Sequence, residues 1–525
     1  MAVEASPDLA AVYAAAPAAA DWLVVLPLAL CLGGGAVALM LRHRGYQRAF
    51  AMGVLAVLVA LVALLLARVL ADGPVAMTMG RWRPPFGITF AADVFGTSLA
   101  LVGAVVALLA AVHAGPEVNE AERRYGFYPL LLLLTAGVMG SFLTGDLFNL
   151  YVWFEVLLIG AFGLLVIGSE RAQVDGTVKY AVLNLVATTV LLIAITALYG
   201  LLGTLNMADI PAKVAALEDG APIGTIAVLF LIAFGMKAAA FPLQAWLPAS
   251  YHTPRLVVSA LFAGLLTKVG VYALLKTLLM LLPAEAGRLS GLVTAIAALT
   301  MLTGALGALA QRDLRRLAGY LVISGIGNML IGLGLGTARA LEGAVFYAVH
   351  SMLVSTGLFM AAGLAVRFGG TGDLNRLGGL YARRPLVAAL FLVPAFAIAG
   401  LPPLSGFWPK LILTDAAIAS GHGWLAAAVL IAGLLSTLAV GRAWLYAFWR
   451  NGAEDAPDDA PPRTLPEPPA RRAALALYGP TAVLAAATLL IGLVPGPVFT
   501  LASGAAAGLL DPQPYVEAVF GGGTP

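Results

Sequence analysis

The sequence predicts an all-α integral membrane protein with about fourteen transmembrane helices. Three observations lead to this class. First, 61% of the 525 residues are hydrophobic and only 11% are charged, whereas about 25% charged residues is usual for a soluble domain. Second, apolar runs of the roughly 20 residues that cross a bilayer as a helix recur from end to end. Third, lysine and arginine are concentrated in alternate loops.

The apolar runs define the predicted spans and the organisation of the chain. The spans, in order, cover residues 22–42, 48–70, 91–113, 127–145, 147–168, 178–202, 222–249, 256–282, 288–310, 315–336, 341–366, 386–418, 423–449 and 474–501. We group them into an N-terminal three-helix segment (1–113), two large units (127–282 and 288–450), a linker (451–473) and a C-terminal helix and tail (474–525). The linker is acidic and rich in proline, which is typical of a flexible segment.

The positive charges predict the orientation of the spans. Loops that follow odd-numbered spans hold nineteen of the 30 lysines and arginines, and loops that follow even-numbered spans hold five. Positive loops face the cytoplasm. We therefore expect a multi-pass protein of the bacterial cytoplasmic membrane with both termini outside and the linker inside.

Other features exclude several classes of function. The acidic start MAVEASPDLA lacks the basic region of a cleaved signal peptide. The single cysteine, Cys31, excludes an internal disulfide bond. A net charge of +3 with basic residues confined to short loops gives no reason to expect a nucleic-acid partner. No phosphate-binding loop, dinucleotide motif or metal-spaced Cys/His cluster is present, so we expect no cofactor, no metal and no enzyme.

Five titratable residues fall near the middle of predicted spans: Glu155, Lys237, Lys268, His350 and Lys410. A charge at the bilayer centre costs about 2.5–3.5 kcal/mol on insertion scales and usually marks an ion route. A desolvated lysine loses its proton more readily, and a nearby carboxylate favours the charged form. These residues predict an intramembrane proton relay. The alternative is a set of buried ion pairs that only lock helices together, and a lone histidine such as His350 is often a satisfied core residue.

Charged residues nearer the span ends have a different interpretation. For Arg68, Lys276 and Arg442 we expect long side chains that snorkel to the membrane surface. Asp93 and Asp146 are weak candidates for binding an exported cation.

Two segments combine a lysine with helix-breaking prolines. In AFGMKAAAFPLQAWLP, Pro242 follows Lys237, and in GLPPLSGFWPK, Pro402 and Pro403 precede Lys410. Proline removes a helix hydrogen bond. The freed carbonyls must line a wet cavity or meet protein donors. Such broken helices at matching positions indicate a transporter built from inverted repeats, here of five helices each, with spans four to eight and nine to thirteen as the halves and spans seven and twelve broken.

Four motifs carry a resemblance to a known family: GDLFNLYVWFEV (145–156), FGMKAAAFPLQAWLP (234–248), YHTPRLVVSALFAGLLTKVGVYALLK (251–276) and GLPPLSGFWPK (400–410). They resemble the antiporter-like subunits shared by respiratory complex I, membrane-bound hydrogenases and Mrp-type multisubunit cation/proton antiporters, and within that group the D-type subunits of the Mrp antiporters. The resemblance covers about residues 90–450 and implies fourteen core helices with two inverted five-helix repeats.

The resemblance also implies roles for matching residues. Glu155 matches a glutamate that pairs with the lysine of the broken seventh helix, Lys237. Lys268 matches the bridging lysine of the eighth helix, His350 the histidine of a broken eleventh helix, and Lys410 the terminal lysine of the broken twelfth helix. The chain departs from the pattern at Ser355, where many relatives carry a lysine.

These expectations combine into one function and its rivals. We expect a proton-translocating subunit that works with other small and large membrane subunits, uses the proton gradient and exports Na⁺, with K⁺ and Li⁺ left open. The main alternative is a proton-pumping subunit of complex I or of a hydrogenase. A non-transporting scaffold and a stand-alone solute symporter are the other rivals.

Overall fold

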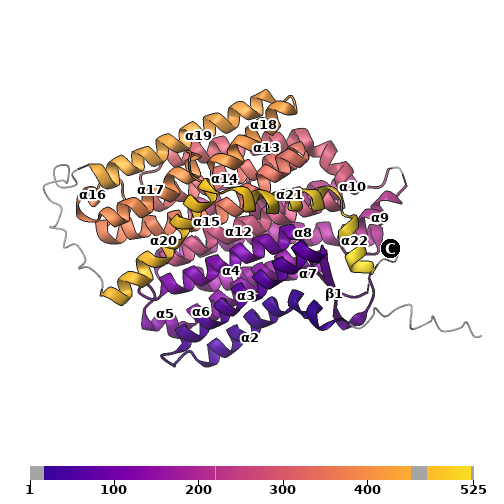
Figure 1. Cartoon of the computed structure of the whole chain (residues 1–525), viewed down its shortest axis with the longest axis horizontal. Helices are drawn as coiled ribbons and strands as arrows, with labels where there is room; N and C mark the ends of the chain where they lie inside the picture. Colours follow the sequence, from indigo (N-terminus) through magenta and orange to yellow (C-terminus); the bar gives the residue numbers. More distant parts are fainter. Residues whose placement is uncertain (1–16, 85, 219, 451–469, 522–525) are drawn as a thin grey trace, which may run out of the picture.

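The computed structural model describes residues 17–84, 86–218, 220–450 and 470–521. Long helices run across the body in broadly the same direction (Figure 1). Within this described part, ten helices are long and apolar enough to cross a membrane, and five shorter apolar helices of 10–17 residues accompany them. The chain is therefore a multi-pass α-helical membrane protein, as its composition predicts.

The N-terminal segment contains three helices and a small β-hairpin. Its elements are η1 (Ala19–Val24), α2 (Leu26–Met40), α3 (Gln47–Asp72), β1 (Val75–Thr78), η2 (Met79–Arg81), β2 (Thr89–Ala92) and α4 (Val94–Ala114). The strands pair antiparallel, with Val75 opposite Ala92. The predicted third span therefore starts too early, because residues 91 and 92 belong to β2, and α4 begins only after Asp93 caps it.

The next segment contains the first broken helix. Its elements are α5 (Glu120–Tyr125), α6 (Phe127–Leu143), α7 (Leu147–Leu165), α8 (Arg171–Leu202), α9 (Ile210–Ala215), α10 (Ile223–Ala238), α11 (Trp246–Ser250), α12 (Leu256–Leu275) and the π-helical turn η3 (Lys276–Leu281). The α12 helix continues directly into η3. The predicted span 222–249 is thus divided between α10 and α11, as Pro242 predicts.

The following segment contains the second broken helix. Its elements are α13 (Pro283–Ala310), α14 (Leu314–Leu335), α15 (Ala338–Gly369), α16 (Leu380–Arg383), α17 (Pro385–Ala399), α18 (Phe407–Ala419), α19 (Gly423–Trp444) and η4 (Leu445–Trp449). The predicted span 386–418 is divided between α17 and α18.

The C-terminal segment corrects the prediction of one continuous last span at 474–501. It consists of α20 (Arg471–Leu493), α21 (Gly496–Leu510) and α22 (Gln513–Phe520). The chain leaves the helical conformation at Val494, directly before Pro495, because a residue that precedes proline disfavours helical geometry. Most of the predicted linker 451–473 lies outside the described residues, and its last three residues already belong to α20.

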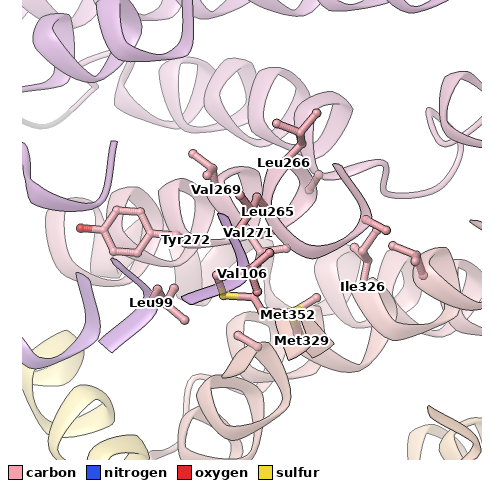
Figure 2. Packing of buried hydrophobic residues seen from close by; sticks show 14 of the residues in the cluster. Leu99, Val106, Leu265, Leu266, Val269, Val271, Tyr272, Ile326, Met329 and Met352 are labelled. Atoms are coloured by element: carbon pink, nitrogen blue, oxygen red, sulfur yellow. The ribbon is translucent and has the colours of Figure 1, made fainter. Parts of the chain in front are cut away.

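One helix lies entirely inside the protein. All of the apolar window of α12 and η3 is buried, whereas only 39% of the corresponding windows of α3, α8 and α20 is buried. Figure 2 shows α12 side chains packed between Leu99 and Val106 of α4, Met329 of α14 and Met352 of α15. A Cβ atom on Gly270 would lie 2.6 Å from the backbone nitrogen of Ala238, so glycine lets α12 press directly on the end of α10.

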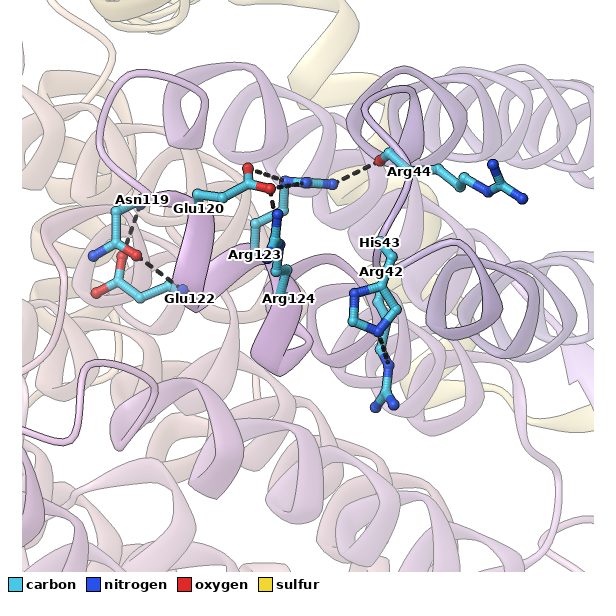
Figure 3. A network of polar contacts seen from close by, with 8 residues as sticks. All are labelled: Arg42, His43, Arg44, Asn119, Glu120, Glu122, Arg123 and Arg124. Atoms are coloured by element: carbon cyan, nitrogen blue, oxygen red, sulfur yellow. Dashed lines mark hydrogen bonds and ion pairs between the residues drawn. The ribbon is translucent and has the colours of Figure 1, made fainter.

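The two ends of the helical body differ in composition. One end carries α5, with Arg123 and Arg124, and α16, with Arg383, and we call it the arginine-rich face. The opposite face carries β1, α9 and α22 (Figure 1). Figure 3 shows the network at the arginine-rich face, where Glu120 binds Arg123 and Arg124. Arg123 also donates to the carbonyl oxygen of Arg44 at 2.6 Å. This network ties the loop before α3 to α5.

Candidate functional site

Glu155 and Lys237 are joined through a third side chain. Glu155 lies half-buried on α7, and Lys237 lies buried in the last turn of α10. The hydroxyl of Thr188 on α8 donates to Glu155 Oε1 at 2.9 Å and accepts from Lys237 Nζ at 3.0 Å. Lys237 Nζ also lies 4.7 Å from the centre of the Phe154 ring. The two charges therefore communicate across a hydroxyl bridge instead of touching.

Thr188 is a site residue that the sequence analysis missed. A threonine in an apolar helix usually bonds to its own backbone, as Thr189 does with Leu185 O at 2.9 Å. One signal could have found it. Tyr180, Asn184 and Thr188 recur every four residues on the buried stripe of α8, and a polar stripe inside a membrane bundle indicates contacts between helices.

Side chains of α11 and α13 form hydrogen bonds with the backbone at the first break. The α10 helix ends at Ala238, and Ala239 adopts a left-handed conformation with φ of 61°. The indole of Trp246 donates to Met236 O at 2.8 Å, and the Phe241 N–H donates to Thr300 Oγ1 at 3.0 Å. The pocket of about 200 Å³ beside Pro242 is lined by apolar side chains. Side-chain hydrogen bonds therefore help to hold the backbone at this gap, beside an apolar pocket.

The second break uses its own lysine. The α17 helix ends at Ala399, and Gly400 follows with φ of 94°. Lys410 Nζ, reaching back from α18, donates to Ile398 O at 3.0 Å and to Ala399 O at 2.7 Å. A cation at the C-terminal end of a helix is also favoured by the helix dipole.

His350 contacts the second break. It is buried on α15, and its Nδ1 lies 2.8 Å from Ser405 Oγ in the loop between α17 and α18. Near the position where relatives carry a lysine, the hydroxyls of Ser351 and Ser355 lie 3.4 Å apart.

Lys268 lies between these two groups on the buried helix α12. Its side chain is 1% exposed, and Nζ donates to Ala263 O at 2.5 Å. In the part of the chain that the structure describes, no direct hydrogen bond joins Lys268 to Lys237, His350 or Lys410. The structure thus brings the predicted residues into two clusters, with Lys268 on the helix between them.

The two candidate cation ligands both cap helices. Asp93 accepts from Gly96 N at 2.7 Å and pairs with Lys276 at 2.7 Å. Asp146 accepts from Asn149 N at 2.7 Å. Among the described residues, no three His, Cys, Asp or Glu side chains gather closely enough to hold a metal ion.

The residues that were expected to snorkel behave differently from one another. Arg68 pairs with Asp21 at 2.8 Å and keeps 24% of its side chain exposed. Arg442 donates to the carbonyl oxygen of Gln311. Lys276 is only 1% exposed, so the snorkelling prediction is wrong for this residue, because Tyr515 of α22 covers its ammonium group and Asp93 pairs with it.

A polar pocket of about 270 Å³ opens at the arginine-rich face beside the start of α12. Glu117 lies in its wall and accepts from Val257 N at 3.0 Å, which caps α12 from another loop. Burial alone would raise the pKa of Glu117. The hydrogen bond and charge of His113, the Val257 N–H and the charge of Arg315 together hold that pKa below its usual value.

Comparison with known proteins places this geometry in a family. The sequence profile of the family described as "NADH:quinone oxidoreductase/Mrp antiporter, TM" matches residues 144–436. The chain is 38% identical to the D-type Na⁺/H⁺ antiporter subunit of Alkalihalophilus pseudofirmus, over 95% of this chain and 99% of that protein.

Two solved structures share the fold. A chain of the Mrp complex from Dietzia sp. DQ12-45-1b superposes with a TM-score of 0.87 and 30% identity, covering 96% of this chain and all of that one. A chain of respiratory complex I from Thermus thermophilus superposes with a TM-score of 0.78 and 28% identity, covering 93% and 100%. The chain belongs to the NADH:quinone oxidoreductase/Mrp antiporter transmembrane family.

Proposed function

We propose that this chain is the proton-translocating subunit of a multisubunit antiporter that exchanges Na⁺ or a related monovalent cation for protons. The observation that carries the proposal is the chain Glu155–Thr188–Lys237, with hydrogen bonds of 2.9 and 3.0 Å. The driving force is the proton gradient. The similarity to D-type antiporter subunits over nearly the whole chain supports this assignment.

The first cluster gives Lys237 two states. While Glu155 stays close, its negative charge favours the protonated lysine. When Glu155 moves away, or Thr188 turns its hydroxyl, the buried ammonium loses that stabilisation and releases its proton. Thr188 bridges the two groups and therefore transmits the state of the carboxylate to the amine.

The second cluster receives the proton. From Lys237 it passes to Lys268, whose helix presses on the end of α10 at Gly270. Transfer across the steps without direct hydrogen bonds requires water or side-chain motion. His350 and Ser405 connect Lys268 to the second break, where Lys410 exchanges with the other aqueous face.

The helices support fourteen crossings in two inverted repeats. Counting each broken pair once, the first repeat is α6, α7, α8, α10–α11 and α12–η3, and the second is α13, α14, α15, α17–α18 and α19–η4. The broken pair is fourth in each, and an odd number of crossings inverts the second repeat. The arginine-rich face is then cytoplasmic, and both termini lie outside a bacterial inner membrane.

The partial exposure of Glu155 supports the proposal that this chain assembles with further membrane subunits. Its side chain is half-buried in the isolated chain, on a surface where α7 and α8 expose Val152, Ile159 and Leu185. A carboxylate near the middle of a span is costly against lipid. A neighbouring subunit that covers this surface would remove that cost and could also move Glu155.

A proton-pumping subunit of complex I or of a hydrogenase is the second candidate. The fold shared with complex I favours it, because the same side chains would serve either assembly. The identities of 38% and 36% to D-type antiporter subunits over 95% of the chain favour the antiporter. Purification of the assembled complex would separate the two, since only the second would retain redox subunits.

The test of the proposal uses everted vesicles from antiporter-deficient cells that express this chain with its partner subunits. Glu155→Gln and Lys237→Ala should each abolish the Na⁺-dependent collapse of the pH gradient. Assembly, followed on native gels, should be unchanged. Normal exchange in either variant would contradict the relay.

Matched controls separate charge removal from the relay. Lys213 and Glu218 are exposed near α9. Lys213→Ala and Glu218→Gln remove the same charges at a surface and should leave exchange intact.

A further inference from the structure

Lys276 is a buried charge that the relay described above does not use. It begins η3, the π-helical end of α12, and its side chain is 1% exposed. Its Nζ lies 2.7 Å from Asp93 Oδ2, 4.4 Å from the centre of the Tyr515 ring and 5.6 Å from that of Tyr272. The titratable groups around this ammonium therefore come from the N-cap of α4, from α22 and from α12 itself.

Lys276 lies on the same side of its helix as Lys268. Lys268, Tyr272 and Lys276 are spaced four residues apart, which places them on one helical face. Two turns, about 12 Å along the axis, separate the two lysines. All three side chains are buried, and the Tyr272 hydroxyl donates to Phe142 O at 3.0 Å. Lys268 of the proposed relay and Lys276, the partner of Asp93, thus lie on one face of α12.

Asp93 connects this buried face to the surface. Its side chain is 16% exposed and lines a pocket of about 320 Å³ between the start of α4 and the C-terminal helices. Gly504, Gly508 and Asp511 form part of the opposite wall. The neighbouring elements β1 and α22 lie on the face opposite the arginine-rich one (Figure 1). One partner of the ion pair is therefore sealed inside, and the other borders an opening.

Several buried hydroxyls, on residues close in sequence to the ion pair or on the tyrosine whose ring covers Lys276, have no hydrogen-bond partner within the described structure. They are those of Tyr515 on α22, Thr277 beside Lys276, and Thr97 and Ser98 one turn along α4 from Asp93. A buried hydroxyl with no partner costs free energy. These hydroxyls are available as hydrogen-bond partners for water that enters from the pocket.

We propose that the Asp93–Lys276 ion pair is the port through which the relay exchanges protons with the aqueous phase on the face opposite the arginine-rich loops. The inference rests on the proposed transport function and adds an access route to it. A proton from the pocket neutralises the Asp93 carboxylate. Lys276, now without its counter-charge, passes its own proton toward the Lys268 amine. The proton on Asp93 then moves to the Lys276 amine and restores the pair, so one proton has moved inward.

Lys276→Arg is the sharpest test, because arginine keeps the ion pair but cannot give up its proton. In proteoliposomes that contain the complete complex, we expect exchange to fall at least tenfold. We expect the difference in exchange rate between the variant and the unmodified complex to grow as the pH on the Asp93 side rises. At higher pH fewer protons reach Asp93, so proton uptake at this site limits the rate. A rate equal to that of the unmodified complex across this pH range would overturn the port.

A second variant tests whether the loss of exchange in Lys276→Arg comes only from the larger size of arginine. Replacing a buried ion pair by neutral groups of similar volume is often well tolerated by the fold. Asp93→Asn combined with Lys276→Met should therefore accumulate normally yet lose exchange as Lys276→Arg does. Normal exchange in this double variant would mean that the pair is only structural.

Two controls complete the design. Arg339 and Glu342 form a more exposed ion pair at 3.0 Å, and Arg339→Met combined with Glu342→Gln should leave exchange unchanged. Glu155→Gln separates the two hypotheses. If it retains exchange, the proposed function fails. If it abolishes exchange while both Lys276 variants remain active, only the port fails.

Discussion

The two broken helices carry the same kinds of residues but use their lysines in opposite ways. At the first break, Lys237 precedes the gap and turns away from it toward Thr188, while Trp246 supplies the donor for Met236 O. At the second break, Lys410 follows the gap and is itself the donor for two carbonyls of α17. One lysine is free to respond to a carboxylate, and the other is bound to the backbone.

This difference suggests two different roles for the two lysines. Lys237 has a bridged carboxylate partner, whereas in the described ranges Lys410 has no carboxylate within ion-pair distance. Backbone carbonyls cannot be neutralised, so the hydrogen bonds of Lys410 hold its ammonium group beside the end of α17. We infer that the first break sets when a proton moves and the second sets where it leaves.

The largest expected effect compares the two lysines directly. Lys237→Met and Lys410→Met should each abolish exchange, but only Lys410→Met leaves Ile398 O and Ala399 O without their donor. An unsatisfied buried acceptor costs about 1–3 kcal/mol. The unfolding temperature in detergent should therefore fall further for Lys410→Met than for Lys237→Met. Equal decreases in unfolding temperature would contradict the different roles inferred for the two lysines.

A smaller effect should come from the bridge. Thr188→Val keeps the shape of the side chain but removes both hydrogen bonds, and a hydrogen bond to a charged group contributes about 1.5–3 kcal/mol. We expect exchange to slow by at least about tenfold, with assembly unchanged. Thr188→Ser, which restores the hydroxyl, is the matched control. If valine and serine variants transport equally fast, the bridge has no role.

The smallest effect concerns the residue that ends each half-helix. Ala239 has a positive φ of 61°, whereas Gly400 occupies the equivalent place with φ of 94°. A left-handed conformation costs a residue with a Cβ atom about 1–2 kcal/mol. Ala239→Gly should raise the unfolding temperature slightly, and Gly400→Ala should lower it, also because its Cβ would lie 2.6 Å from Lys410 Cδ. Opposite signs in thermal melts would support this account, and matching signs would contradict it.

Much of the fold follows from the sequence, for clear physical reasons. Apolar length locates the helices, and proline with a nearby lysine locates both breaks, because neither is tolerated against lipid. The division of α20 from α21 was also readable, since Pro495 lies inside the predicted span. The β1–β2 hairpin was hidden by the short length of its strands.

The contacts within the site were harder to predict. Glu155, Lys237, Lys268, His350 and Lys410 stand out because charge is rare in membrane helices, and their roles stay predictions. A lone hydroxyl does not stand out in this way, so Thr188 was missed. Lys276 was misjudged because its burial depends on α22, whose Tyr515 lies more than two hundred residues further along the chain.

The complete enclosure of α12 has a consequence for how the protein meets its lipid. Every residue in the apolar window of this helix and η3 is buried by the rest of the chain, whereas only 39% of the corresponding windows of α3, α8 and α20 is buried. Changes in bilayer thickness act on exposed helices, which tilt or distort to match it. If protons move along α12 as we propose, their route is shielded from changes in bilayer thickness, which act on the outer helices. The residues of the proposed relay on this helix would then keep their geometry when the lipid composition changes.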